Sequence, residues 1–180
     1  VIDDNDRMVI GNAMPDVTGG LNTTVTWKNL SLYLGFYYSL GGQIYNAAEH
    51  NRNMFKYTGT TPSPEVIHNM WLHPGDQAIY PRPYNDDYNN ARMGNSFYLE
   101  DASFIRLQNI RVAYDLPENW IKKLMLMNIN IYAFVNNALT WTNYSGFDPE
   151  FSTNNPLQVG KDSYRYPRKR EYGIGFSANF

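Results

Sequence analysis

The chain has no cysteine, which excludes disulfide bonds and cysteine-ligated metal sites. It also lacks any apolar run of about 18 residues, so no transmembrane helix is expected. The formal net charge is only −2 over 180 residues, which gives no support to nucleic-acid binding. The low mean hydropathy of −0.52 does not exclude a membrane protein. Strands of an outer-membrane barrel carry only about ten alternating residues each, so their average looks polar.

Aromatic residues, by contrast, are plentiful: they make up 16% of the chain, led by 15 tyrosines. The last ten residues alternate between an apolar set and a small or polar set. The apolar set is Tyr172, Ile174, Phe176, Ala178 and Phe180. Because successive side chains of a strand point to opposite faces, this pattern predicts a strand with one apolar and one polar face. A strand of this length that ends on an aromatic residue is typical of the lipid-facing wall of a barrel.

The same alternation predicts four earlier strands, over about 21–28, 30–38, 103–114 and 127–141. Lys28 and Asn29 make a tight turn between the first two. In the third strand the apolar phase slips by one residue, which predicts a β-bulge near Gln108 and Asn109.

The connections between these strands alternate between short and long. The turns at 28–29 and 115–123 are short, whereas 40–102 and 143–170 are long. Five prolines between residues 62 and 83 block regular pairing in the first long connection, whose start reads as a short helix. Barrels of outer membranes have short periplasmic turns and long outer loops, so the long connections are predicted to be outer loops.

The predicted fold is all-β: about five neighbouring strands of a large antiparallel transmembrane β-barrel. Five strands cannot close a barrel, since closure takes at least about eight. An open sheet in lipid would leave unpaired backbone groups at two edges, each costing several kcal/mol. The sequence shows no signal peptide, and we expect the chain to be the tail of a longer polypeptide. The alternatives are a soluble carbohydrate-binding β-sandwich and a passive porin.

Aromatic residues at the ends of the apolar faces are candidates for a membrane girdle. Trp27 and Trp120 fall near the predicted periplasmic interface, and Trp141 and Tyr144 near the outer one. The full set of girdle and assembly-signal candidates is Trp27, Tyr38, Trp120, Trp141, Tyr172, Phe176 and Phe180. The opposite face is predicted to line the lumen with Tyr33, Tyr37, Tyr132 and Phe134.

Four segments resemble the C-terminal part of the SusC/RagA family of TonB-dependent outer-membrane transporters. They are residues 6–32, 96–117, 137–150 and 166–180, in the family's order and just under half of the chain. Three motifs carry the resemblance: Gly-Asn-x-x-Pro-Asp from Gly11, Ser-Phe-x-Arg-Leu from Ser103, and Tyr-Ser-Gly-x-Asp-Pro-Glu from Tyr144. The long connection 40–102 matches no motif of the family.

The resemblance implies a barrel of the 22-strand type whose lumen is closed by a plug domain. Neither the plug nor the earlier strands lie in this chain. It also implies import energised by TonB, a surface lipoprotein of the SusD type as a lid, and an oligosaccharide or peptide as cargo. The expected location is the outer membrane of a Bacteroidota-like Gram-negative bacterium, embedded in its lipid. No cofactor is implied.

Aromatic residues of the long connection are candidates for cargo contact, because flat rings stack on sugar rings. They are Trp71, Tyr80, Tyr84 and Tyr88. The same rings could instead pack the loop against itself or contact a lid protein.

The sequence gives no residue-level support for catalysis, a metal or nucleic-acid binding. The oxygen-rich start, Asp3, Asp4, Asn5 and Asp6, lacks EF-hand spacing, so a solvated loop is the better interpretation. A turn at Pro149 explains Asp148 and Glu150. The spacing of the three histidines, His50, His68 and His73, matches no zinc site. The basic run 165–170 either binds lipopolysaccharide phosphates or merely flanks the membrane, and the second reading is preferred.

Overall fold

The computed structural model describes residues 5, 7–53, 61–81, 94–121, 126–150 and 159–179. The chain divides into two compact units, each built from three segments. The sheet unit consists of Pro15–Gly41, Ala102–Asn143 and Pro167–Phe180. The loop unit consists of Val1–Met14, Gly42–Asp101 and Tyr144–Tyr166. None of the described helices has both the length and the hydropathy needed to cross a bilayer.

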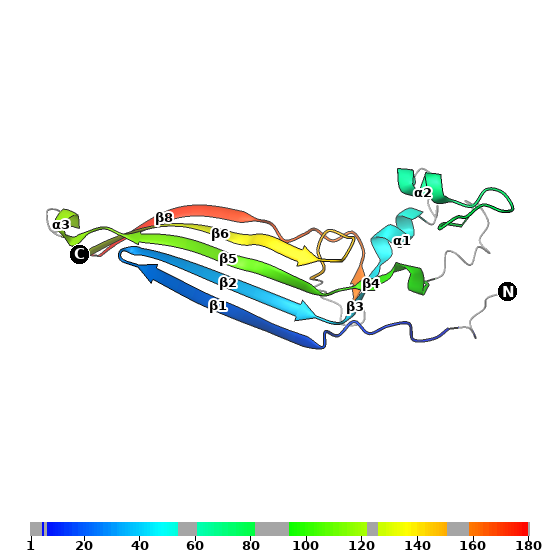
Figure 1. Cartoon of the computed structure of the whole chain (residues 1–180), viewed down its shortest axis with the longest axis horizontal. Coiled ribbons are helices and arrows are strands. Elements are labelled where there is room, and N and C mark those ends of the chain that lie inside the picture. The colour runs from blue at the N-terminus through cyan, green and yellow to red at the C-terminus, as the bar shows by residue number, and fades with distance from the viewer. Residues whose placement is uncertain are drawn as a thin grey trace. The chain divides into compact units, whose positions relative to one another are not determined.

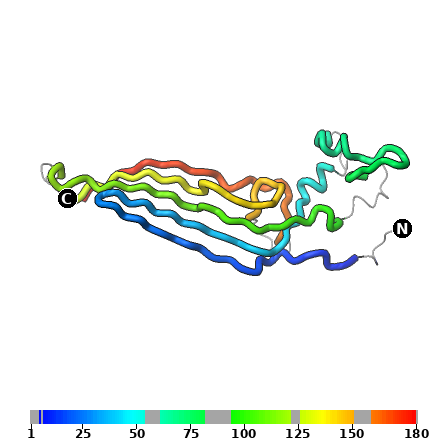
Figure 2. Tube along the Cα trace, in the orientation of Figure 1, coloured from blue at the N-terminus to red at the C-terminus, as the bar shows by residue number. Residues whose placement is uncertain are grey.

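The sheet unit is a five-stranded antiparallel sheet in the order β1-β2-β5-β6-β8, with its strands side by side in Figure 1. The strands are β1 (Val17–Trp27), β2 (Leu30–Leu40), β5 (Phe104–Asp115), β6 (Asn128–Thr142) and β8 (Glu171–Asn179). Lys28 takes a positive φ of 54° in the turn between β1 and β2. Both short connections lie at the same end of the sheet (Figure 2), and a short helix, α3 (Glu118–Ile121), occupies the second. The five predicted strands and their alternating connections are confirmed.

Two irregularities set the phase of the central strands. Gly35 and Phe36 of β2 lie opposite Asn109 and Leu107 of β5, so Gln108 is one extra residue in β5. The predicted bulge at Gln108 and Asn109 is therefore confirmed. Strand β6 then carries one residue more than β5, and Asn137 absorbs it with a φ of 53°. The short polar side chain of asparagine is one of the few that tolerate this left-handed conformation.

The loop unit is built around a small sheet in the order β4-β3-β7. Its strands are β3 (Gln43–Asn46), β4 (Leu99–Asp101) and β7 (Lys161–Asp162). Helix α1 (Ala47–Asn53) continues directly from β3, and α2 (Pro64–Asn69) begins after Ser63, whose hydroxyl accepts a hydrogen bond from the Val66 amide at 3.4 Å. A single 3-10 turn (Ser96–Tyr98) precedes β4. The buried side chains of Ile44, Ala47, Val66 and Tyr98 form the core of this unit.

The sequence interpretation was wrong at two places. It began the first strand at about residue 21 and read residues 1–20 as a loop with short extended pieces, but residues 17–20 are the first four residues of β1. It also treated most of 40–102 as irregular, whereas this connection contributes two strands of the small sheet and a second helix. The short helix expected at its start is confirmed as α1.

Candidate functional site

The two faces of the five-stranded sheet differ sharply in chemistry. Partner residues across the ladders share a face, so the register assigns every strand side chain to one of two surfaces. One surface is almost wholly apolar, and many of its large side chains are 39% to 84% exposed. They include Val17, Leu21, Val25, Trp27, Leu30, Ile105, Val112, Tyr114, Ile131, Leu139, Trp141, Tyr172, Ile174 and Phe176. An exposed apolar surface of this extent marks contact with a membrane or another protein.

Five aromatic side chains of this apolar face lie in two rows across it. Trp27, Tyr114 and Phe176 share the row nearest the short turns, with Leu30 and Ile131 between them. Tyr38 and Trp141 share a second row with Ile105. Eight residue steps of β2 separate the rows, from Leu30 to Tyr38, which is about 27 Å along the strand. At the tilt of barrel strands this becomes about 20 Å along the axis, close to the apolar band of outer-membrane barrels.

The remaining girdle candidates are placed as follows. Tyr172 is exposed on the same apolar face but in the middle of the sheet, opposite Val135. Trp120 is exposed on α3, in the second short connection. Phe180, the proposed end of the assembly signal, lies outside the described residues. Contact of these side chains with lipid stays a prediction.

The opposite face of the sheet is polar and aromatic. Asn109 donates to Asn136 (Nδ2 to Oδ1, 3.0 Å), and Asn136 donates to Glu171 (Nδ2 to Oε2, 3.3 Å). The Arg111 guanidinium lies 4.1 Å from the centre of the Tyr132 ring. Tyr33, Tyr37, Tyr132 and Phe134 all lie on this face, as the alternation predicted. A groove of about 850 Å³ runs over it.

Arg106 of the Ser-Phe-x-Arg-Leu motif is buried on this polar face. Its Nε donates to the Thr140 hydroxyl at 3.0 Å, and its guanidinium carbon lies 5.1 Å from the centre of the Phe104 ring. Two neighbouring strands thus hold one cation between a hydroxyl and an aromatic face. The sequence named this residue only through its motif, because nothing local distinguishes a buried arginine from an exposed one.

The Tyr-Ser-Gly-x-Asp-Pro-Glu motif ties the second long connection to two strands of the loop unit. The buried Tyr144 hydroxyl donates to Oδ2 of Asp162 on β7 at 2.7 Å. The Ser145 amide donates to Oε2 of Glu100 on β4, and its hydroxyl donates to Oε1, both at 2.8 Å. Asp148 accepts a hydrogen bond from the Glu150 amide at 3.0 Å, which confirms the expected turn. The motif therefore acts as a structural clamp.

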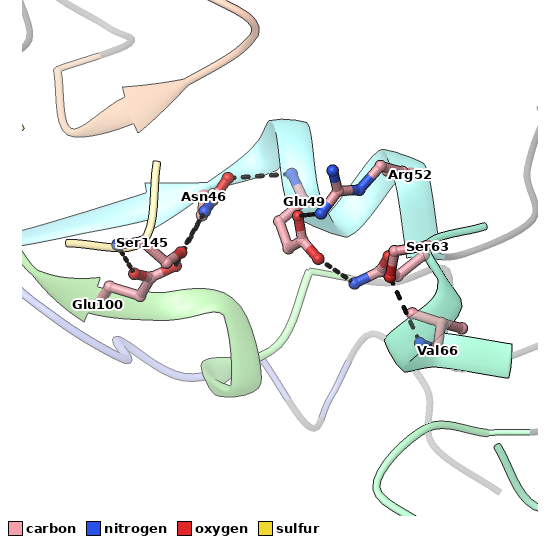
Figure 3. Close-up of polar contacts among 8 residues, drawn as sticks. Asn46, Glu49, Arg52, Ser63, Val66, Glu100 and Ser145 are labelled. Atoms are coloured by element: carbon pink, nitrogen blue, oxygen red, sulfur yellow. Dashed lines mark hydrogen bonds and ion pairs between the residues drawn. The ribbon is translucent and has the colours of Figure 1, made fainter. Parts of the chain in front are cut away.

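Glu100 is the centre of a polar network that also reaches α1 (Figure 3). Its Oε1 accepts a second hydrogen bond, from Asn46 Nδ2 at 2.9 Å. The Asn46 Oδ1 accepts from the Glu49 amide at 2.9 Å and so caps the start of α1. Glu49 in turn contacts Arg52 and accepts from Asn53 Nδ2 at 2.6 Å. None of these residues was predicted from the sequence, because the contacts of Glu100, which connect the network, join segments that are distant in the sequence.

Gly146 allows the Tyr144 ring to approach the backbone, and Gly146→Ala is expected to destabilise the loop unit. A Cβ atom at this position would lie 2.4 Å from the ring, too close without displacing it. We expect a cost of about 1–3 kcal/mol, as for overpacking elsewhere. Limited proteolysis of the protein would measure it. Gly94→Ala is the control, since its Cβ would meet nothing closer than 3.7 Å. Equal protease sensitivity of the two variants would contradict the packing argument.

Two buried tyrosines predict how the loop unit responds to alkaline pH. Burial raises the pKa of Tyr98 to about 12. Burial, and then the hydrogen bond to Asp162, raises the pKa of Tyr144 as well. The folded state favours the neutral phenols, so their contribution is complete below about pH 10 and is lost as the pH rises through the folded pKa. Proteolysis between about pH 9 and pH 11.5 should accelerate, and less so in Tyr98→Phe. An acceleration in Tyr98→Phe and Tyr144→Phe as large as in the unsubstituted protein would contradict this assignment.

The structure describes two of the four predicted cargo-contact residues, Tyr80 and Trp71. Tyr80 is buried and packs edge-on against Phe97, with ring centres 5.8 Å apart. Trp71 is partly exposed, and its amide donates to the Tyr80 carbonyl at 2.9 Å. Tyr84 and Tyr88 lie outside the described residues. Contact with cargo stays a prediction for all four.

The histidine and acidic candidates form no metal centre in the part of the chain that the structure describes. His50 is buried, its Nδ1 lies 3.0 Å from the Tyr45 hydroxyl, and its ring packs on Tyr98. Asp3, Asp4 and Asp6 lie outside the described residues. In the basic run, Lys169 pairs with Glu171 at 2.8 Å, and Arg170 Nε donates to the Asn137 carbonyl at 3.4 Å.

Comparisons with known proteins give a consistent result. No family model matches the chain. TonB-dependent receptor P39 of Formosa agariphila is 34% identical over 178 residues, and TonB-dependent receptor SusC of Bacteroides thetaiotaomicron is 25% identical over 185 residues. These alignments cover 98% and 99% of the chain but only 17% and 16% of the relatives, so the chain spans about one sixth of their length. Among solved structures, the RagAB peptide transporter matches with a TM-score of 0.76 and 25% identity, over 93% of this chain and 17% of that one.

Proposed function

The chain belongs to the SusC/RagA type of TonB-dependent receptors, and we propose that it supplies five wall strands and two outer loops of an outer-membrane nutrient importer. The observation that carries this is the pair of unlike faces of one sheet. An apolar, exposed face suits lipid, while a polar face with a groove of about 850 Å³ suits a lumen. The relatives are TonB-dependent receptors, so the β-sandwich alternative is set aside.

The free edges of the sheet support a larger barrel. Among the described strands, β1 and β8 each pair on one side only. In lipid each unpaired backbone group at such an edge costs several kcal/mol, so both edges need neighbouring strands. The rest of the barrel is the natural source of these strands. The polar face, with its buried Arg106 and its Asn109–Asn136–Glu171 chain, would then face a plug domain that the rest of the receptor provides.

The finer assignments concern partners and cargo. TonB would energise import through a region of the receptor outside this chain, and a SusD-like surface lipoprotein would cover the outer loops. The cargo would be an oligosaccharide or a peptide. The importer named in a matching structure, RagAB, is a peptide importer, which supports the class of activity but not the cargo of this chain.

Uptake by intact cells tests the importer function. The full-length receptor should deliver radiolabelled cargo to the periplasm only when TonB is present, and it should co-purify in mild detergent with a surface lipoprotein. The cargo would first be identified by growth on single carbon and nitrogen sources. Equal uptake with and without TonB would indicate a passive porin and would overturn the proposal.

A further inference from the structure

We propose that the loop unit carries a subsite for one neutral sugar ring, formed between Phe147 and Tyr164. This inference rests on the proposed function, since it names the class of cargo that the outer loops recognise. The pocket has a volume of about 160 Å³. Helix α1 lines one side of it, and the segments around Phe147 and Tyr164 line the other.

Two aromatic rings line this pocket and are largely exposed in the part of the chain that the structure describes. Phe147 is 82% exposed and Tyr164 is 62% exposed. Tyr164 also has a φ of 60°, a left-handed conformation that is unusual for a bulky residue. Such backbone strain costs stability, so it persists only where the surrounding structure enforces it, and it is concentrated at functional sites. Rings that face solvent beside a polar floor can pack on the C–H face of a sugar, as aromatic side chains do in ligand pockets.

The floor of the pocket is polar, and two of its side chains are well buried. Asn46 is 3% exposed and Asp162 is 6% exposed. Each oxygen of Asp162 already accepts one hydrogen bond, from the Tyr144 hydroxyl and from the Arg165 amide. An ionised carboxylate has about four acceptor positions, so each oxygen can accept a further bond from a ligand hydroxyl.

The charged pair on α1 completes the floor. Glu49 and Arg52 contact one another (Figure 3). Both side chains also line the pocket. Arginine contributes only donors and glutamate only acceptors. Sugar hydroxyls both donate and accept, and they match such a mixed floor. Two carboxylates against one guanidinium leave the pocket net negative, which disfavours an anionic ligand such as a uronate.

The size of the pocket limits what it can enclose. Its volume is below the roughly 300–1,000 Å³ of pockets that bury a whole drug-sized ligand. It therefore suits one ring of a longer chain that continues outside. A peptide bound by strand addition would need a long free edge, and β7, which contributes Asp162, is only two residues long. The geometry favours a saccharide over a peptide.

Binding measurements on the purified full-length receptor test the subsite. Isothermal titration would use neutral hexasaccharides (maltohexaose, cellohexaose, laminarihexaose, mannohexaose and xylohexaose), hexagalacturonate and hexaalanine as probes. At least one neutral saccharide should bind. Phe147→Ala and Tyr164→Ala should each weaken that binding by about tenfold, while Tyr164→Phe, which keeps the ring, should retain most of it.

Tyr166→Ala is the matched control. Tyr166 is 98% exposed, lies two residues from Tyr164 and does not line the pocket, so its loss should leave the affinity unchanged. Unchanged affinity in both pocket variants, tight binding of hexaalanine or hexagalacturonate alone, or no binding of any neutral saccharide would overturn the subsite. A receptor that binds saccharide normally but shows no TonB-dependent uptake would instead overturn the importer function alone.

Discussion

Replacing Leu21 by arginine is expected to reduce assembly of the full-length receptor in the outer membrane strongly. Leu21 lies midway along β1, is exposed on the apolar face and pairs with Phe36. If this face meets lipid, an arginine near the middle of the bilayer costs about 2–4 kcal/mol. The same arginine on a water-exposed surface would cost little, within about 0.5 kcal/mol. The loss of assembly thus distinguishes a face that contacts lipid from a face that contacts water.

Thr24→Arg is the matched control for this prediction. Thr24 lies three residues further along the same strand, is also exposed, and belongs to the polar face opposite Tyr33. Heat-modifiable migration in gels would report the folded fraction of each variant recovered from outer membranes. We expect a clear loss for Leu21→Arg and near-normal recovery for Thr24→Arg. Equal recovery of both, or the reverse order, would show that the apolar face is not turned to lipid.

The phase of the long strands could be predicted from the sequence because it depends on a local pattern. Side chains alternate with a period of two, so the slip between Leu107 and Ile110 is visible in the sequence and indicates the extra residue Gln108. The start of β1 was missed because Gly19 and Gly20 resemble a turn. In the structure Gly19 leaves room for the Tyr38 ring, whose hydroxyl oxygen would be 2.5 Å from a Cβ there. A glycine that accommodates a cross-strand ring has no local sequence signal.

Apart from α1, the loop unit could not be predicted because its contacts are long-range. Strand β3 pairs with β4 and β7, which follow it by more than 50 and more than 110 residues. Each of these strands is too short to show a period. The pocket residues Phe147 and Tyr164 were likewise missed, because nothing in the sequence distinguishes them from the other aromatic residues of the long connections. Only the Tyr144–Glu150 motif pointed to this region, through its family resemblance, and it gave no indication that Tyr144 would contact Asp162.

Glu100→Ala is expected to loosen the loop unit strongly, because one carboxylate holds three donors from two other segments. The amide and hydroxyl of Ser145 would lose the Glu100 acceptor, and Asn46 Nδ2 would keep only its contact with the Ser145 hydroxyl at 3.1 Å. Hydrogen bonds to a charged group contribute about 1.5–3 kcal/mol each, and they are not additive within one network. A total of about 3 kcal/mol would lower amide-exchange protection near Ser145 by roughly 100-fold in the full-length receptor.

Two further variants test whether the effect of Glu100→Ala comes from its lost hydrogen bonds or only from the loss of a negative charge. Glu100→Gln keeps one acceptor oxygen but presents an amide to at least one donor, so its loss of protection should be intermediate. Glu65→Ala removes an exposed carboxylate from the first turn of α2, where the interaction with the helix dipole is worth about 0.3–1 kcal/mol, and it should leave exchange at Ser145 unchanged. If Glu65→Ala and Glu100→Ala gave the same exchange pattern, loss of negative charge would explain both. If Glu100→Ala alone exposed the amides of residues 144–150, the family motif would be a clamp closed by Glu100, and the position of Phe147 would depend on it.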